Sequence, residues 1–176
     1  MWSVGRRLYL GNYWSGEQAL LGIKAPVHPT GSESAFSGVV SLCPMPLEGE
    51  SLIGPVCEST EWLHVPIADG GVGDGEFAAA LDLCLPFVAQ RRRHGNVLIH
   101  CAAGMSRSVS VVAAILCIDD PTLSVDEAYR SIAHAKAAAI GTPPGDEDLV
   151  VAPAWEFLSY LRQRFAEPAR GANGRP

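Results

Sequence analysis

A cysteine and an arginine lie at the two ends of a seven-residue segment, Cys101 to Arg107, in the middle of the chain. The apolar run 97–99 before it predicts a buried strand, and the apolar spacing after it predicts a helix. A loop that enters a helix in this way turns backbone N–H groups into one concavity, where the helix dipole also favours negative charge. Arg107 adds paired donors that match phosphate oxygens. The spacing therefore predicts an anion site with a cysteine at its floor.

The cysteine of this segment is placed to act as a nucleophile. The positive field that attracts an anion also lowers the pKa of the Cys101 thiol, and the thiolate is the form that attacks. A phosphate held against a thiolate indicates phosphoryl transfer. The competing interpretation is a small buried cysteine beside an unrelated surface arginine. The complete spacing, with Gly104 inside it and the expected strand and helix around it, argues against that interpretation.

The elements that must position this segment indicate an α/β fold. Strands are predicted at 8–10, 39–42, 62–67 and 96–100, and helices at 15–21, 74–93, from 107 onward, at 124–139 and at 153–165. We expect one domain over residues 1–165, with a central, mostly parallel, twisted sheet of four to five strands and helices on both faces. Residues 166–176 are expected to form a flexible tail.

Local signals refine this expectation. Ser124 with Glu127 predicts a capping box, and Asp74 is expected to cap its helix. Pro86 predicts a kink inside that helix. Irregular loops are expected at 24–37, 48–55 and 141–152.

Composition limits the function classes. The chain is 48% hydrophobic and 18% charged, as globular proteins are, and its net charge of −6 argues against a general binder of nucleic acid or anionic membranes. No apolar run is long enough for a membrane span, no signal peptide is visible, and no Cys/His spacing suggests a metal. Five cysteines then indicate a reducing compartment, so we expect a cytoplasmic protein in which Cys84 and Cys117 are core thiols.

The segment His100 to Ser108 resembles the signature loop of the cysteine-dependent protein tyrosine phosphatase superfamily. Its Ala-Gly-x-Ser-Arg-Ser pattern is similar to that of the dual-specificity branch. Scattered further likeness covers about residues 4–163, notably at 8–11, 38–42, 62–69 and 153–161. The resemblance implies a tyrosine-phosphatase-like fold. It also implies hydrolysis of phosphotyrosine and phosphoserine or phosphothreonine in proteins, with no cofactor, by a chain expected to be a monomer.

The resemblance also implies roles for single residues. Cys101 would attack phosphorus and form a cysteinyl-phosphate, while Arg107 and the loop amides hold the equatorial oxygens. Asp69, which ends an apolar strand and begins a glycine-rich loop, would protonate the leaving group and later activate water. Asp74 is the runner-up for that acid. The expected phosphate-binding residues are Ala102, Ala103, Gly104, Met105, Ser106 and Arg107.

Two neighbours of this loop have supporting roles. The resemblance implies that His100 orients the loop through hydrogen bonds and is not an acid. The Ser108 hydroxyl could reach the sulfur of Cys101 and stabilise the thiolate as it leaves in the second step. The alternative for Ser108 is capping of the following helix.

Several alternatives stay open at this stage. A small domain implies a shallow pocket that tolerates several phosphorylated residues, and a lipid or small-metabolite phosphate is also a possible substrate. A non-catalytic phospho-binding module, a rhodanese-like domain and a redox-regulated thiolate are the other interpretations. The chain also departs from the family pattern: residues 137–151 contain no arginine, and Ala154 follows Pro153 where the family has asparagine.

Overall fold

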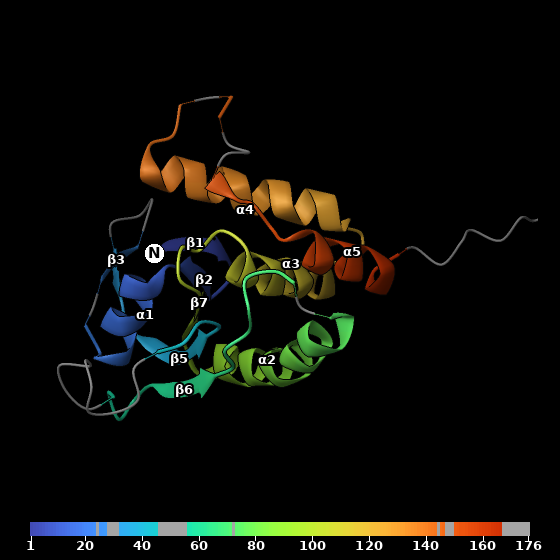
Figure 1. The fold of residues 1–176 in the computed structure, drawn as a ribbon. Helices are drawn as coiled ribbons and strands as arrows, with labels where there is room; N and C mark the ends of the chain where they lie inside the picture. The colour runs from blue at the N-terminus through green and yellow to red at the C-terminus, as the bar shows by residue number, and fades with distance from the viewer. Residues whose placement is uncertain are drawn as a thin grey trace, which may run out of the picture.

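The computed structural model describes residues 1–23, 25–27, 32–45, 56–71, 73–143, 145–146 and 150–166. Its main sheet has five strands in the order β1-β2-β7-β5-β6 (Figure 1). These strands are β1 (Trp2–Gly5), β2 (Leu8–Gly11), β5 (Phe36–Ser41), β6 (Glu61–His64) and β7 (Asn96–His100). Only β1 runs antiparallel to its neighbour, and the remaining pairs are parallel. The predicted, mostly parallel sheet is confirmed.

Helices cover both faces of this sheet, as predicted (Figure 1). They are α1 (Tyr13–Leu20), α2 (Asp74–His94), α3 (Arg107–Asp119), α4 (Val125–Ile140) and α5 (Trp155–Arg164). Helix α1 packs on one face, and α2 to α5 contribute to the larger core on the other face. Within the described part of the chain, no helix is both long and apolar enough to cross a bilayer.

The central strand β7 shows why its sequence is apolar without alternation. Val97 and Ile99 belong to the larger core, and Leu98 belongs to the smaller core under α1. All three side chains are fully buried. A parallel strand that is covered on both faces has no solvent side to mark with polar residues. This strand delivers the segment that begins at Cys101 into the middle of the fold.

Three short strands were not predicted. Strand β1 reaches β2 through a turn at Arg7, whose φ of 55° lies in the left-handed region without the glycine or asparagine that usually signals it. Strands β3 (Ala25–Val27) and β4 (Ser32–Ser34) pair with each other inside the segment 24–37, so the prediction of an irregular loop there is partly wrong. Strands of three residues are too short to show an alternating pattern.

The helix boundaries follow from the caps. The capping box of Ser124 and Glu127 is confirmed. The N-cap of α2 is Gly73, so the capping role predicted for Asp74 is wrong, and the helix continues past Pro86 to His94. Helix α1 begins two residues earlier than predicted because the Asn12 side chain accepts a hydrogen bond from the Ser15 N–H. The expected loop at 48–55 and residues 167–176 of the expected tail lie outside the described residues.

Candidate active site

The segment from Cys101 to Ser106 leaves the carboxyl end of β7 and enters α3 at Arg107, as predicted. The parallel strands β5 and β6 end at the same edge of the sheet, and the chain reaches Asp69 shortly after β6. Ligands of parallel α/β sheets bind outside the carboxyl ends of the strands. The fold therefore brings the predicted nucleophile, arginine and acid to one edge.

Three carbonyl groups of the loop between Cys101 and Arg107 accept hydrogen bonds from donors outside the loop. Ala102 O accepts from Tyr13 N–H at 3.0 Å, Gly104 O accepts from Lys136 Nζ at 2.7 Å, and Met105 O accepts from Ala152 N–H at 2.9 Å. In a trans peptide the C=O and the following N–H point in opposite directions. The N–H groups of Ala103, Met105 and Ser106 are therefore directed into the loop, as a phosphate cradle requires.

Gly104 is required at the tightest point of this loop. Its φ is 68°, a conformation that favours glycine, and a Cβ there would lie 2.8 Å from the carbonyl oxygen of Gly11. The prediction that a side chain would obstruct this turn is confirmed. The close approach also brings the loop against β2, which pairs with β7.

The thiol of Cys101 is buried, with Sγ 3.1 Å from the Ser108 Oγ. Burial alone would raise the pKa of Cys101. Hydrogen bonds from the Ser108 hydroxyl and from the N–H groups of Ser108 and Gly104, together with the charge of Arg107, outweigh burial and lower it. The N-cap residue of α3 is Ser106, so the alternative in which Ser108 caps this helix is wrong. The local field favours a thiolate.

Arg107 and Asp69 meet at this site. The Arg107 side chain is 7% exposed, and its Nη1 donates to Ile67 O at 3.1 Å. Its Nη2 forms an ion pair with Asp69 Oδ2 at 3.2 Å, and the Asp69 side chain is 53% exposed. The buried Nε of Arg107 has no hydrogen-bond partner within the described residues. A buried donor without an acceptor is costly, so this one is available to an incoming oxyanion.

His100 is buried beneath the loop, and its ring Nε2 lies 2.6 Å from Ser41 Oγ. Desolvation lowers the pKa of His100 to about 4, so the ring is neutral near pH 7. Its Nδ1 lies 3.4 Å from the Cys101 carbonyl oxygen, which can only accept, so Nδ1 carries the proton and Nε2 accepts from Ser41. Trp62 Nε1 in turn donates to Ser41 Oγ at 2.9 Å.

The start of α5 connects the acid loop to the phosphate loop. Gly71 N–H donates to the Glu156 carboxylate at 2.9 Å, and Ala154 N–H donates to Ser106 Oγ at 3.1 Å. Backbone N–H groups, including that of Gly71, lower the pKa of Glu156. The contact of Ala154 uses only its backbone N–H, so it does not require the asparagine of the family pattern.

The roles of Lys136, Ser41 and Glu156 in this site were not predicted from the sequence. Lys136 could have been found, because it continues the buried stripe of α4 that contains Tyr129, Ile132 and Ala133, where a charged residue is unexpected. Ser41 and Glu156 carry no comparable signal. Their contacts depend on how strands and loops meet in three dimensions.

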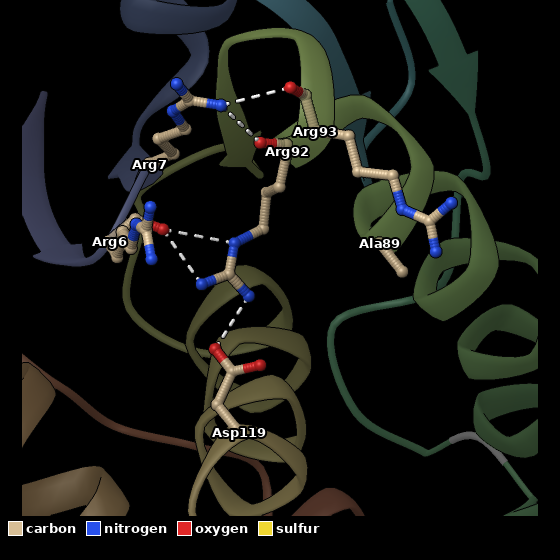
Figure 2. A pocket seen from close by; sticks show the side chains of 6 residues that line it. All are labelled: Arg6, Arg7, Ala89, Arg92, Arg93 and Asp119. Atoms are coloured by element: carbon tan, nitrogen blue, oxygen red, sulfur yellow. Dashed lines mark hydrogen bonds and ion pairs between the residues drawn. The ribbon is translucent and has the colours of Figure 1, made fainter.

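A separate pocket of about 570 Å³ (Figure 2) lies at the end of α3 remote from Arg107. It is lined by Arg6, Arg7, Ala89, Arg92, Arg93 and Asp119. Arg92 donates from Nε and Nη2 to Arg6 O, and its Nη1 pairs with Asp119 at 2.6 Å. Arg7 donates to the carbonyls of Arg92 and Arg93 at the end of α2. These contacts tie the β1–β2 turn to α2 and α3, so we assign them a structural role.

The described residues offer no metal site. Within the ranges given above, no group of three or more histidine, cysteine or acidic side chains is arranged to hold a metal ion. All five cysteines are free thiols. Cys84 and Cys117 are buried, as predicted for core thiols, and burial raises the pKa of Cys84 to about 12.

Comparisons with known proteins identify a family and a fold. The family model described as "Dual specificity phosphatase, catalytic domain" matches residues 55–143. Dual specificity protein phosphatase 12 of Rattus norvegicus is 33% identical over 104 residues, which are 58% of this chain and 30% of the relative. The Homo sapiens protein of the same name is 38% identical over 87 residues, 49% of this chain and 25% of the relative. The matched region thus spans less than a third of the length of these relatives.

Solved structures show the same fold. Human DUSP28 superposes with a TM-score of 0.58 at 21% identity, covering 92% of each chain. DUSP15 superposes with a TM-score of 0.62 at 22% identity, covering 93% of this chain and 86% of that one. At such identities the likeness establishes the architecture, and the family model adds the sequence relationship.

Proposed function

We propose that this chain hydrolyses phosphate monoesters of proteins through a cysteinyl-phosphate intermediate. The chain belongs to the family of dual-specificity phosphatase catalytic domains. The observation that carries the proposal is the state of Arg107. Its buried Nε–H has no partner within the described residues, and its Nη2 is held only by the half-exposed Asp69. An oxyanion over Cys101 would satisfy the first donor and replace the partner of the second.

Substrate binding replaces the Asp69 carboxylate by phosphate as the partner of Arg107. Before binding, Asp69 pairs with Arg107 as a carboxylate. A phosphate dianion in the loop takes the donors of Arg107 and leaves the Asp69 carboxylate beside a second negative charge. Substrate therefore releases Asp69 from its ion pair with Arg107, so that this carboxyl group can face the leaving group.

In the first chemical step the Cys101 thiolate attacks phosphorus, a P–S bond forms and the P–O bond to the leaving group breaks. Asp69 donates its proton to the departing oxygen. Charge on the equatorial oxygens is stabilised by Arg107 and by the N–H groups that the outward-facing carbonyls direct into the loop. The helix dipole of α3 acts in the same direction.

In the second step Asp69, now a carboxylate, takes a proton from water. The water oxygen attacks phosphorus, the P–S bond breaks, and inorganic phosphate is released. The Ser108 hydroxyl, 3.1 Å from Sγ, donates to the thiolate as it forms. His100 stays neutral throughout and holds the Cys101 carbonyl, so it orients the loop without exchanging protons.

For the substrate class we propose phosphotyrosine together with phosphoserine and phosphothreonine in proteins. The small size of the domain supports a shallow pocket, and Ala102 and Ala103 in the loop are exposed. A shallow site reaches phosphate on short as well as long side chains. Panels of phosphorylated peptides, with inositol phosphates as the competing class, test this part of the proposal.

Turnover of para-nitrophenyl phosphate between pH 5 and 8, in EDTA, tests the mechanism. We expect Cys101→Ser to be inactive. Asp69→Asn should lose about 10²-fold or more in kcat, together with the basic limb of the pH profile. A wild-type chain that binds vanadate but does not turn over would overturn the proposal and identify a phospho-binding module.

A further inference from the structure

Lys136 lies beneath the phosphate loop, on the inner side of α4. It is 5% exposed, and its Nζ donates to Gly104 O at 2.7 Å. The same ammonium lies 5.0 Å from the centroid of the Trp2 ring. Gly104 is the loop residue with the left-handed φ and the close approach to β2. Lys136 thus contacts the loop at its most constrained point.

Among the described residues, this ammonium has no carboxylate partner. None of the ion pairs found among the described residues includes Lys136. Burying a cation is costly unless it is paired, and the face of an aromatic ring compensates for only part of that cost. Burial lowers the pKa of Lys136, and the negative charge of the Cys101 thiolate opposes this shift.

We propose that Lys136 is a positioning residue of the phosphatase site, which holds the loop through Gly104 and whose charge is balanced by the Cys101 thiolate and then by bound phosphate. This inference rests on the proposed function. It assigns the site a second cation, placed behind the loop, in addition to Arg107 inside it. A compact ammonium with rotatable donors suits this position between a carbonyl and a ring.

The other titratable groups that face Cys101 do not duplicate this role. Arg107 from α3 is the other cation, and its charge is shared with Asp69. Cys43, which follows β5, has a pKa raised chiefly by burial, so it is an uncharged thiol near pH 7. His100 is neutral there as well. Lys136 therefore supplies a positive charge that no other described neighbour replaces.

Alkylation of Cys101 by iodoacetamide as a function of pH measures the thiolate directly and requires no turnover. Lys136→Met removes the charge with little change of length. We expect its alkylation profile to move to higher pH by about half a unit or more. Inhibition by inorganic phosphate should weaken by about fivefold or more, because a phosphate dianion interacts with the same charge.

Tyr129→Phe is the matched control on the same helix. It removes the hydrogen bond from Tyr129 to Ser110 and changes no charge near the loop, so the alkylation profile should stay in place. Thermal melts of all variants establish that they are folded. A folded Lys136→Met chain with the wild-type profile and wild-type phosphate inhibition would overturn the proposal.

A reciprocal measurement covers the case in which Lys136→Met does not fold. In Cys101→Ser the thiolate is absent, and ¹⁵N NMR of the lysine ammonium groups should then give a lower pKa for Lys136 than in the wild type. An unchanged value would refute the coupling. A wild-type chain that shows the coupling yet fails to hydrolyse para-nitrophenyl phosphate would refute the proposed function and leave the electrostatic role of Lys136 intact.

Discussion

The two ends of the molecule each contain an arginine that binds backbone carbonyls and a carboxylate, but they use it differently. Arg92 directs Nε, Nη1 and Nη2 to protein acceptors, namely the Arg6 carbonyl and Asp119. Arg107 keeps a buried Nε without a described partner and pairs with an aspartate that is half-exposed. The contacts of Arg92 join the β1–β2 turn to α2 and α3, whereas the donors of Arg107 are fully paired only when an anion binds. The thiol of lowered pKa beside Arg107 therefore marks the reactive end of the molecule.

The surroundings of the two arginines reinforce this contrast. Arg107 begins α3 beside a thiol whose pKa is lowered, and Asp119 ends the same helix beside Arg92. The pocket beside Arg92 contains no nucleophile within its described lining. Helix α3 therefore begins at the proposed active site and ends at contacts that stabilise the fold.

Exchanging each arginine for lysine is the sharpest test of the contrast and should give the largest effect. Arg107→Lys loses the planar fork that binds two phosphate oxygens, and we expect kcat/KM to fall by about 10³-fold or more. Arg92→Lys should keep kcat/KM within about twofold and reduce the free energy of unfolding by about 1 kcal/mol. Steady-state kinetics and urea unfolding separate the two outcomes, and equal losses of activity would contradict the comparison.

Acid should destabilise the reactive end first, through His100. Its pKa is about 4 in the folded chain, below its usual value of 6.5, so the unfolded chain binds the proton more readily. The free energy of unfolding should fall as pH decreases from about 6.5 to 4, by about 3 kcal/mol in total. Urea unfolding across this range measures it. His94→Gln, an exposed change at the arginine end, should leave the slope unchanged.

Two glycines with nearly the same φ separate strain from steric contact. Gly104→Ala adds a Cβ 2.8 Å from Gly11 O, whereas Gly141→Ala adds one in open space, and their φ values are 68° and 72°. We expect Gly104→Ala to cost about 2 kcal/mol of stability and to weaken phosphate binding. Gly141→Ala should cost about 1 kcal/mol and preserve activity. Thermal melts and phosphate inhibition give the two readouts.

The smallest expected effect concerns the hydroxyl beside the thiol. Ser108→Ala removes a hydrogen bond that lowers the pKa of Cys101, so that pKa should rise by about one unit. The acid limb of the kcat/KM profile then moves to higher pH, and release of phosphate from the cysteinyl intermediate slows. Alkylation rates and a pre-steady-state burst measure these changes. An unmoved acid limb would show that the 3.1 Å contact does not tune the thiol.

The sequence predicted the parts of the site that a short spacing determines. The interval from Cys101 to Arg107, the apolar strand before it and the glycine-rich turn after Asp69 are local patterns with a physical cause. The alternation of strands and helices likewise predicted an α/β fold. Lys136 was missed although it continues the buried stripe of α4, because nothing in that stripe indicates that its partner is the carbonyl of Gly104. The turn at Arg7 was missed because its conformation has no residue signature.

The three carbonyl contacts of the phosphate loop have a consequence for synthesis on the ribosome. Their donors belong to α1, to α4 and to the segment before α5, which are made at different times. A nascent chain that has emerged only through α4 contains the nucleophile and the arginine but lacks the Ala152 N–H that fixes the loop at Met105. We expect the phosphate-binding loop of such a chain to be incompletely formed. The reactive thiolate of Cys101 should therefore appear only after Ala152 has been synthesised.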